Sequence, residues 1–290
     1  MKNNFLFFLL LLVACIPVND FLTSDVPYDK PLVFKPELIP EGMLIHSGIF
    51  SPDLEEYYFT LSDKDFTSFT VKKIRKENGR WSEPEDAFFN TKYFEHGMNF
   101  SPDGNTIYFS STRPTEIKDM PETWHIWRSQ KIKEKWSEPE FIDIPNLRNR
   151  MISHPSVTKD GTIYFHSGTP NYKELQLFYS KPTADGKFGA AIKLPEIINF
   201  DAQMVTPWIA PDESYIIFQA GSKIHLSFKA KNGNWEKPQI LNNKINKYAE
   251  GNPYVSPDEQ FLFYAAGTEA DPKNKWTIHW VNIITILDKD

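Results

Sequence analysis

The sequence of 290 residues lacks several features that mark common functional classes. It contains one cysteine, Cys15, which excludes internal disulfides and argues against a cysteine-based metal or redox site. A net charge of −6 without any Lys/Arg cluster argues against nucleic acid as a partner and against an electrostatic membrane patch. No short metal-binding signature, phosphate-binding loop or Gly-x-Ser-x-Gly elbow occurs. The function must therefore be sought in the organisation of the chain.

The N-terminus carries a wholly apolar run at residues 5–13 after a short cationic start. The run is too short for a membrane-spanning helix, which needs about twenty residues. With its small residues before Cys15 it resembles a bacterial lipoprotein signal, which implies a signal peptide at 1–14, lipid attachment at Cys15 and a tether at 15–34. In such lipoproteins an aspartate directly after the lipidated cysteine goes with retention in the inner membrane, and here Ile16 occupies that position. The resemblance therefore implies that the protein is anchored in the outer membrane and faces the periplasm or the exterior. The alternative is a secreted protein with an incidental cysteine.

A short motif, an apolar residue followed by Ser-Pro-Asp or a close variant, occurs five times. The copies begin at Phe50, Phe100, Val157, Ile209 and Val255, with starts 50, 57, 52 and 46 residues apart. Proline, aspartate and glycine favour a tight turn, and the aromatic-rich run after each copy is typical of a buried strand. A near-constant period of this size predicts an all-β, five-bladed β-propeller with four-stranded antiparallel blades.

The chain ends indicate how the ring closes. The fifth repeat reaches its third strand near Trp280 and ends ten residues later, before a fourth strand can form. The earlier repeats mark that strand with a Trp-x-x-Pro pattern, and residues 35–40 resemble the segment that follows it. We expect residues 31–40 to add the missing outer strand to the last blade, which would remove exposed sheet edges.

The blade pattern resembles the TolB-type β-propeller repeat, a WD-like family built around Ser-Pro-Asp-Gly, over residues 35–290. The third copy has Lys159 in place of proline and the fourth has Ala210 in place of serine. The resemblance implies the fold and a periplasm-facing location. It does not identify a partner.

Polar residues precede each of the five turns, where loops that enter the innermost strands meet at the mouth of the channel. They are His46, Glu95 with His96, His154, Gln203 with Thr206, and Glu250 with Asn252. Imidazole and carboxylate bind zinc, manganese or iron, so one reading is a divalent-metal site. Its ligands would be His46, His96, His154 and Glu250. The other reading is a set of polar side chains that line a water-filled channel.

Long loops after the second strands, at residues 111–124 and 267–276, offer a second recognition surface. In the first loop, Arg113 could bind a carboxylate and Trp124 could stack on a ligand. The opposing reading is ordinary loop variability, with Trp124 packed into its blade.

The sequence thus predicts a lipid-anchored propeller of the bacterial envelope that binds a protein partner or a glycan-type ligand and needs no cofactor. The alternative is a metal-dependent carbohydrate-active enzyme, a lyase or glycoside hydrolase, with Glu95 or Glu250 as base. Oligogalacturonate lyases, a propeller group that this chain also resembles, use a histidine-rich metal funnel. Propeller glycosidases instead carry catalytic carboxylates on their innermost strands, and the equivalent segments here, such as 97–100 and 253–255, are neutral.

Overall fold

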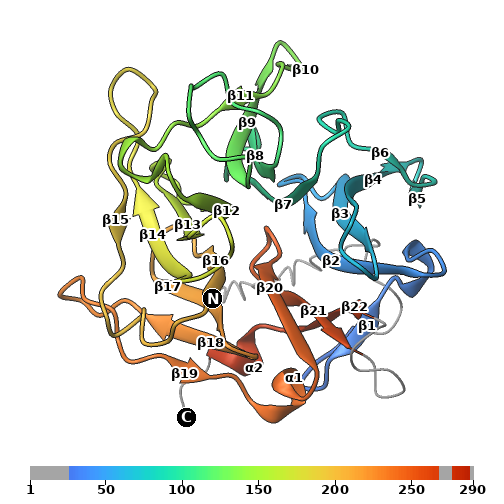
Figure 1. Cartoon of the computed structure of the whole chain (residues 1–290). Helices are drawn as coiled ribbons and strands as arrows, with labels where there is room; N and C mark the ends of the chain where they lie inside the picture. Colours follow the sequence, from blue (N-terminus) through green and yellow to red (C-terminus); the bar gives the residue numbers. More distant parts are fainter. Residues whose placement is uncertain (1–25, 268–275, 288–290) are drawn as a thin grey trace, which may run out of the picture.

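The computed structural model describes residues 26–267 and 276–287. Five small antiparallel sheets surround a central axis, so the predicted five-bladed β-propeller is confirmed (Figure 1). The expected signal peptide, Cys15 and most of the tether lie outside the described residues. Within these residues no helix is both long and apolar enough to cross a bilayer.

Each blade runs from an innermost strand at the axis to an outermost strand at the perimeter. The innermost strands are β2 (Met43–Phe50), β7 (Glu95–Phe100), β12 (Met151–Val157), β16 (Met204–Ile209) and β20 (Ala249–Val255). The second strands are β3 (Glu56–Asp63), β8 (Thr106–Ser111), β13 (Ile163–Gly168), β17 (Tyr215–Ala220) and β21 (Phe261–Gly267). The third strands are β4 (Phe69–Glu77), β9 (His125–Ile132), β14 (Gln176–Ser180), β18 (Lys223–Phe228) and β22 (Trp276–Asn282).

The outermost strands are short, and in blades 1 and 2 they are split in two. They are β5 (Arg80–Trp81) with β6 (Glu85–Asp86), β10 (Lys135–Trp136) with β11 (Glu140–Phe141), β15 (Ile192–Lys193), β19 (Gln239–Ile240) and β1 (Leu32–Phe34). In blade 1 the split falls at Ser82, whose backbone N–H donates to Arg75 O and whose hydroxyl accepts from Arg75 N. Pro84 follows and offers no N–H, which an outer strand with one unpaired edge tolerates. The described residues also form four single-turn helices, at Pro36–Leu38, Pro145–Leu147, α1 (Asn243–Asn246) and α2 (Ile284–Leu287).

The Ser-Pro-Asp motif closes the hairpin between the first and second strands of each blade. In blade 1 the Ser51 hydroxyl donates to Asp53 Oδ1 at 2.5 Å and accepts from Glu56 N at 2.9 Å. The hydroxyls of Ser101, Thr158 and Ser256 bond in the same way to the aspartate two residues later. The turns therefore form from local side-chain chemistry, as their sequence indicates. We call the face on which they lie the hairpin face and the opposite face the entry face.

The ring closes through β1, which pairs antiparallel with β22 in the last blade. Phe34 is 2% exposed, and its ring packs against those of Phe50, Tyr57, Phe263 and Trp280 at centroid distances of 5.1–5.9 Å. The predicted N-terminal closing strand is thus confirmed. It lies earlier than residues 35–40, within the segment that the sequence assigned to the tether, because a helical turn begins at Pro36.

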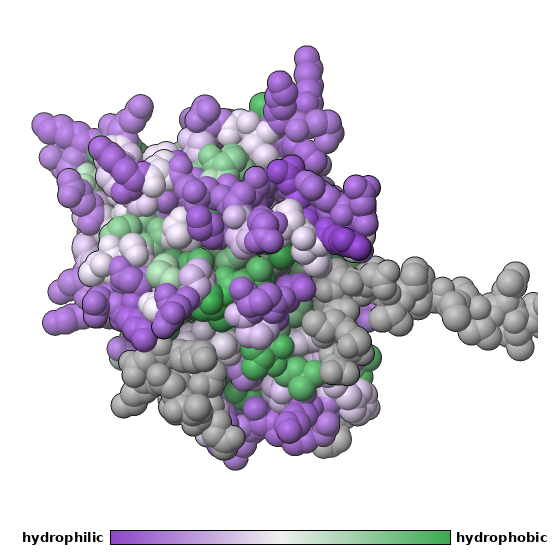
Figure 2. Space-filling model, turned by 90° about the vertical axis from the view of Figure 1, so that its right-hand side faces the viewer, coloured by the Kyte–Doolittle hydropathy of each residue, from purple (hydrophilic) through white to green (hydrophobic). Residues whose placement is uncertain are grey.

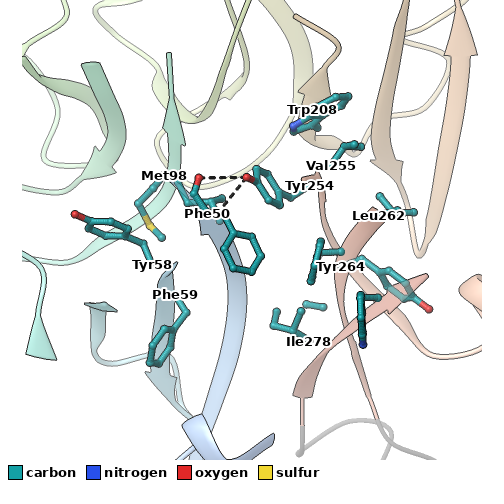
Figure 3. Close-up of a cluster of buried hydrophobic side chains, with 14 of the residues drawn as sticks. Phe50, Tyr58, Phe59, Met98, Trp208, Tyr254, Val255, Leu262, Tyr264 and Ile278 are labelled. Carbon is teal, nitrogen blue, oxygen red and sulfur yellow. Dashed lines mark hydrogen bonds between the residues drawn. The ribbon is translucent and has the colours of Figure 1, made fainter. Parts of the chain in front are cut away.

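Blades pack on one another through aromatic side chains and through bonds to the backbone. The hydroxyl of Tyr254 accepts from Phe50 N at 3.1 Å and donates to Phe50 O at 3.3 Å, which joins the last blade to the first (Figure 3). Viewed from the side of blade 1, hydrophilic side chains project from the described surface, with hydrophobic ones between them (Figure 2).

Candidate functional site

A β-bulge interrupts the innermost strand of every blade near the entry face. Four of them contain a residue with a left-handed backbone at the equivalent position: Gly97 (φ 57°), His154 (φ 55°), Thr206 (φ 48°) and Asn252 (φ 52°). These four residues, with Ser47 of blade 1, line the central channel. The bulges therefore bring one residue from each blade to the channel wall, which the sequence foresaw for His154, Thr206 and Asn252.

Aromatic and imidazole rings form a continuous arc on the entry face, which we call the ring belt. Its members are Trp276, His46, Phe66, Phe69, Trp124, His96, His154 and His166. The tightest contact is between His96 and Trp124, whose rings stack at 3.8 Å between centroids. The belt runs from the last blade through blades 1 and 2 to blade 3.

Serine hydroxyls hold the histidines of the ring belt. His46 Nε2 lies 2.6 Å from Ser62 Oγ, and His96 Nε2 lies 2.9 Å from Ser153 Oγ. The Ser153 hydroxyl is fully buried and is also 3.1 Å from His154 Nδ1. These bonds fix the ring orientations and occupy nitrogens that a metal would need.

Burial keeps the belt histidines neutral. It lowers the pKa of His46 and of His154 to about 4, with His154 adding to the effect on His46. It lowers the pKa of His96 and His166 well below the ordinary value, and neighbouring imidazoles lower both further. At neutral pH the belt therefore carries no charge.

The three histidines proposed as metal ligands do share one belt. However, no group of three or more His, Cys, Asp or Glu side chains within residues 26–267 and 276–287 is placed to hold a metal ion. Glu250, the proposed fourth ligand, is half-buried, and burial raises its pKa. The rings of His96 and His154 face each other at 4.5 Å between centroids, inside an aromatic environment.

Glu95 and Arg113, both proposed as ligand-binding residues, form a buried ion pair with each other. Arg113 Nη2 lies 3.0 Å from Glu95 Oε1, and the two side chains are 11% and 1% exposed. The guanidinium also donates to Ser111 Oγ and Phe89 O and lies between two aromatic rings. Thr91 donates to the carboxylate as well. Both charges are thus used inside blade 2, in a structural role.

The other predicted site residues differ in exposure. Gln203 is exposed, and its backbone oxygen accepts from Gly221 N. Trp124 is 4% exposed, because its ring packs within the belt against His96 and Phe69 instead of projecting from its loop. The counterpart loop at 268–275 lies outside the described residues.

Sequence reasoning missed the apolar members of the site. Phe66, in the turn after β3, is 45% exposed, and Tyr172, in the loop after β13, is 51% exposed. Tyr172 lies beside Trp124 and Thr123 of the neighbouring blade. In the sequence, each of these two residues is recognisable only as an aromatic residue within a polar loop that follows a second strand.

The channel below the belt is narrow. Its cavity has a volume of about 30 Å³, room for about one water molecule. Asn252 Oδ1, at its wall, is buried and has no hydrogen-bond partner among the described residues. A ligand that approaches from the entry face and is larger than water would therefore rest above the channel.

No protein-family model and no curated protein matches this chain. Among solved structures it is similar to a thermostable family-43 glycoside hydrolase, with 15% identity over 86% of this chain and 92% of that one, at a TM-score of 0.54. It is similar to a protein of unknown function from Dyadobacter fermentans, with 13% identity over 87% and 97% of the two chains and a TM-score of 0.51. An oligogalacturonate lyase from Vibrio parahaemolyticus scores 0.40 at 12% identity, over 84% and 68% of the two chains. Likeness at these identities shows the propeller fold alone.

Proposed function

We propose that this protein is a binding module of the bacterial envelope, of the TolB-like repeat type and lipid-anchored through Cys15, whose ring belt holds a glycan-type ligand. The observation that carries the proposal is the belt on the entry face together with two half-exposed aromatic residues, Phe66 within the belt and Tyr172 beside its member Trp124. Aromatic rings exposed at a propeller mouth offer flat apolar surface with polar groups at the edge.

The chemistry of the belt favours a ligand that combines ring faces with hydroxyl groups. The imidazoles are neutral, so the surface attracts no strong ionic partner. Asn252 adds a polar group at the channel wall. Sugar rings present both apolar C–H faces and hydroxyls, and therefore suit this surface better than a charged peptide does.

The same contacts weigh against the metal-dependent enzyme. Two of the proposed ligands, His46 and His96, are bonded to serine hydroxyls. Glu95, one of the two proposed bases, is paired with Arg113. A general base must reach its substrate proton, and a carboxylate 1% exposed inside a blade does not face the mouth.

The proposal is tested by titrating the protein with a panel of neutral and acidic oligosaccharides while the indole N–H resonances are recorded by NMR. The chain has eight tryptophans, so their indole resonances report where on the molecule a glycan binds as well as whether it binds. We expect Trp124 and Trp276 of the belt to shift, and Trp81 and Trp136 of the outer strands and Trp235 of the segment between β18 and β19 to stay unchanged. Shifts confined to the outer strands, or none with any glycan, would reject the belt as the site.

The enzyme alternative has a separate test. Metal content is measured by elemental mass spectrometry on the purified protein and on the His96→Ala/His154→Ala variant. We expect no stoichiometric transition metal in either. A metal bound one to one and lost in the variant would restore the lyase or hydrolase reading.

A further inference from the structure

The hairpin face holds a second cavity, at the other end of the central channel. Its volume is about 250 Å³, several times that of the entry-side cavity. All five blades contribute to it through their turns, which provide Pro52, Pro102, Lys159, Pro211 and Pro257. Four proline rings in rigid turns make a preformed apolar wall, the usual setting for a small-molecule site.

Lys159 is the one departure from this ring of prolines. Its backbone N–H, which proline would lack, donates to Pro211 O of the next blade at 2.8 Å. Its side chain lines the cavity and forms no ion pair among the described residues. The positive charge of Lys159 makes only a small contribution to lowering the pKa of Asp212, which is lowered mainly by the hydrogen bond from the Ser214 side chain. The cavity therefore contains an ammonium group that is available to a ligand.

Three side chains from different blades separate this cavity from the entry side. Asn99, Trp208 and Tyr254 line both cavities and so form the partition between them. Asn99 Oδ1 accepts from Val157 N, and the Tyr254 hydroxyl is bonded to Phe50, so both are held in place. Trp208 is 7% exposed, and its indole lines the cavity.

We infer that this hairpin-face cavity binds a small apolar ring compound that carries one carboxylate. The proline rings and the Trp208 indole pack against the ring, and the Lys159 ammonium binds the carboxylate. The volume corresponds to about eight water molecules at roughly 30 Å³ each, which suits one six-membered ring and its carboxylate. Glu259 is the one acid at the wall, so a second anionic group on the ligand would be repelled.

The test uses two ring acids as probes, benzoate and cyclohexanecarboxylate, each followed by saturation-transfer NMR and calorimetry on the purified protein. Benzamide, which keeps the ring without the charge, is the matched neutral probe. We expect at least one acid to bind and benzamide to bind at least about tenfold more weakly. Binding of neither acid at millimolar concentration, or equal binding of benzamide, would overturn the inference.

Variants assign the effect to the cavity. Lys159→Met keeps the backbone N–H that bonds to Pro211 and should lower acid affinity about tenfold or more. Glu259→Gln should leave the affinity unchanged or raise it, and Lys231→Met, at an exposed turn outside the cavity, should have no effect. Phe66→Ala, in the ring belt, should not change acid binding. The cavity proposal and the ring-belt proposal can therefore be rejected separately. Retained affinity in Lys159→Met would contradict the assignment.

Discussion

Burial decides what a charged residue does in this protein. Arg113 was expected to reach a ligand from a long loop, yet its guanidinium lies between the rings of Phe109 and Trp127 and bonds to Glu95. Burial lowers the pKa of Arg113, and the nearby Glu95 carboxylate opposes this. The pair is therefore part of the blade's interior.

Replacing one member of this pair should destabilise the fold without acting on ligand binding. Arg113→Met leaves the Glu95 carboxylate buried without its counter-ion, and we expect a loss of about 3–5 kcal/mol in the free energy of unfolding. Urea denaturation measures this loss. The double variant Arg113→Met/Glu95→Gln, which removes both charges, should recover much of it. Equal stability of the single variant and the wild type would contradict the structural role.

At the scale of elements, the hairpin turn was readable from sequence because its bonds are local. Ser51, Pro52 and Asp53 contact one another within one turn, and so do the other copies. The ring belt was not readable, since Phe66, His96 and Trp124 meet only after blades pack. The closing strand was predicted, but its bounds were shifted, because the contacts of Phe34 with Phe263 and Trp280 span the whole chain.

The fourth turn offers a gain-of-stability test. Ala210 is 2% exposed and occupies the position where the other copies have a hydroxyl. In Ala210→Ser the new hydroxyl should donate to Asp212 and accept from Tyr215 N, as Ser51 does with Asp53 and Glu56. We expect the variant to be more stable by about 0.5–1.5 kcal/mol in thermal or urea unfolding. A loss of stability would show that this turn differs from the others.

The closing strand offers a second test. Phe34→Ala removes a ring packed between the first and last blades, so we expect a loss of about 3–5 kcal/mol in unfolding free energy. Val33→Ala on the same strand is the matched control, because Val33 is 40% exposed. A similar, small effect of both substitutions on urea unfolding would mean that the strand does not hold the ring closed.

At the scale of the whole molecule, burial lowers the pKa of all seven histidines. Unfolding restores the ordinary pKa of about 6.5, so below that pH the unfolded chain binds more protons than the folded one. Stability should therefore be full above about pH 7 and should fall as pH decreases from about 6.5 to 4. The shifted groups lie in all five blades, so the effect is global.

Calorimetry at pH 7.5 and pH 5.0 measures this dependence, and we expect a clearly lower melting temperature at the lower pH. His154→Gln, which removes one buried imidazole, should show a smaller difference between the two conditions. Identical melting temperatures at both pH values would mean that the imidazoles accept protons in the folded state.

The central claim is that the ring belt binds a ligand through its exposed ring faces. The most direct measurement is the affinity of the best glycan from the panel for the wild type and for Phe66→Ala/Tyr172→Ala, two half-exposed positions where truncation should leave the fold intact. Ile132→Ala, at a position that is 60% exposed at the outer end of β9, is the control. We predict at least about a tenfold loss in the double variant and none in the control. Unchanged affinity in the double variant would contradict the claim.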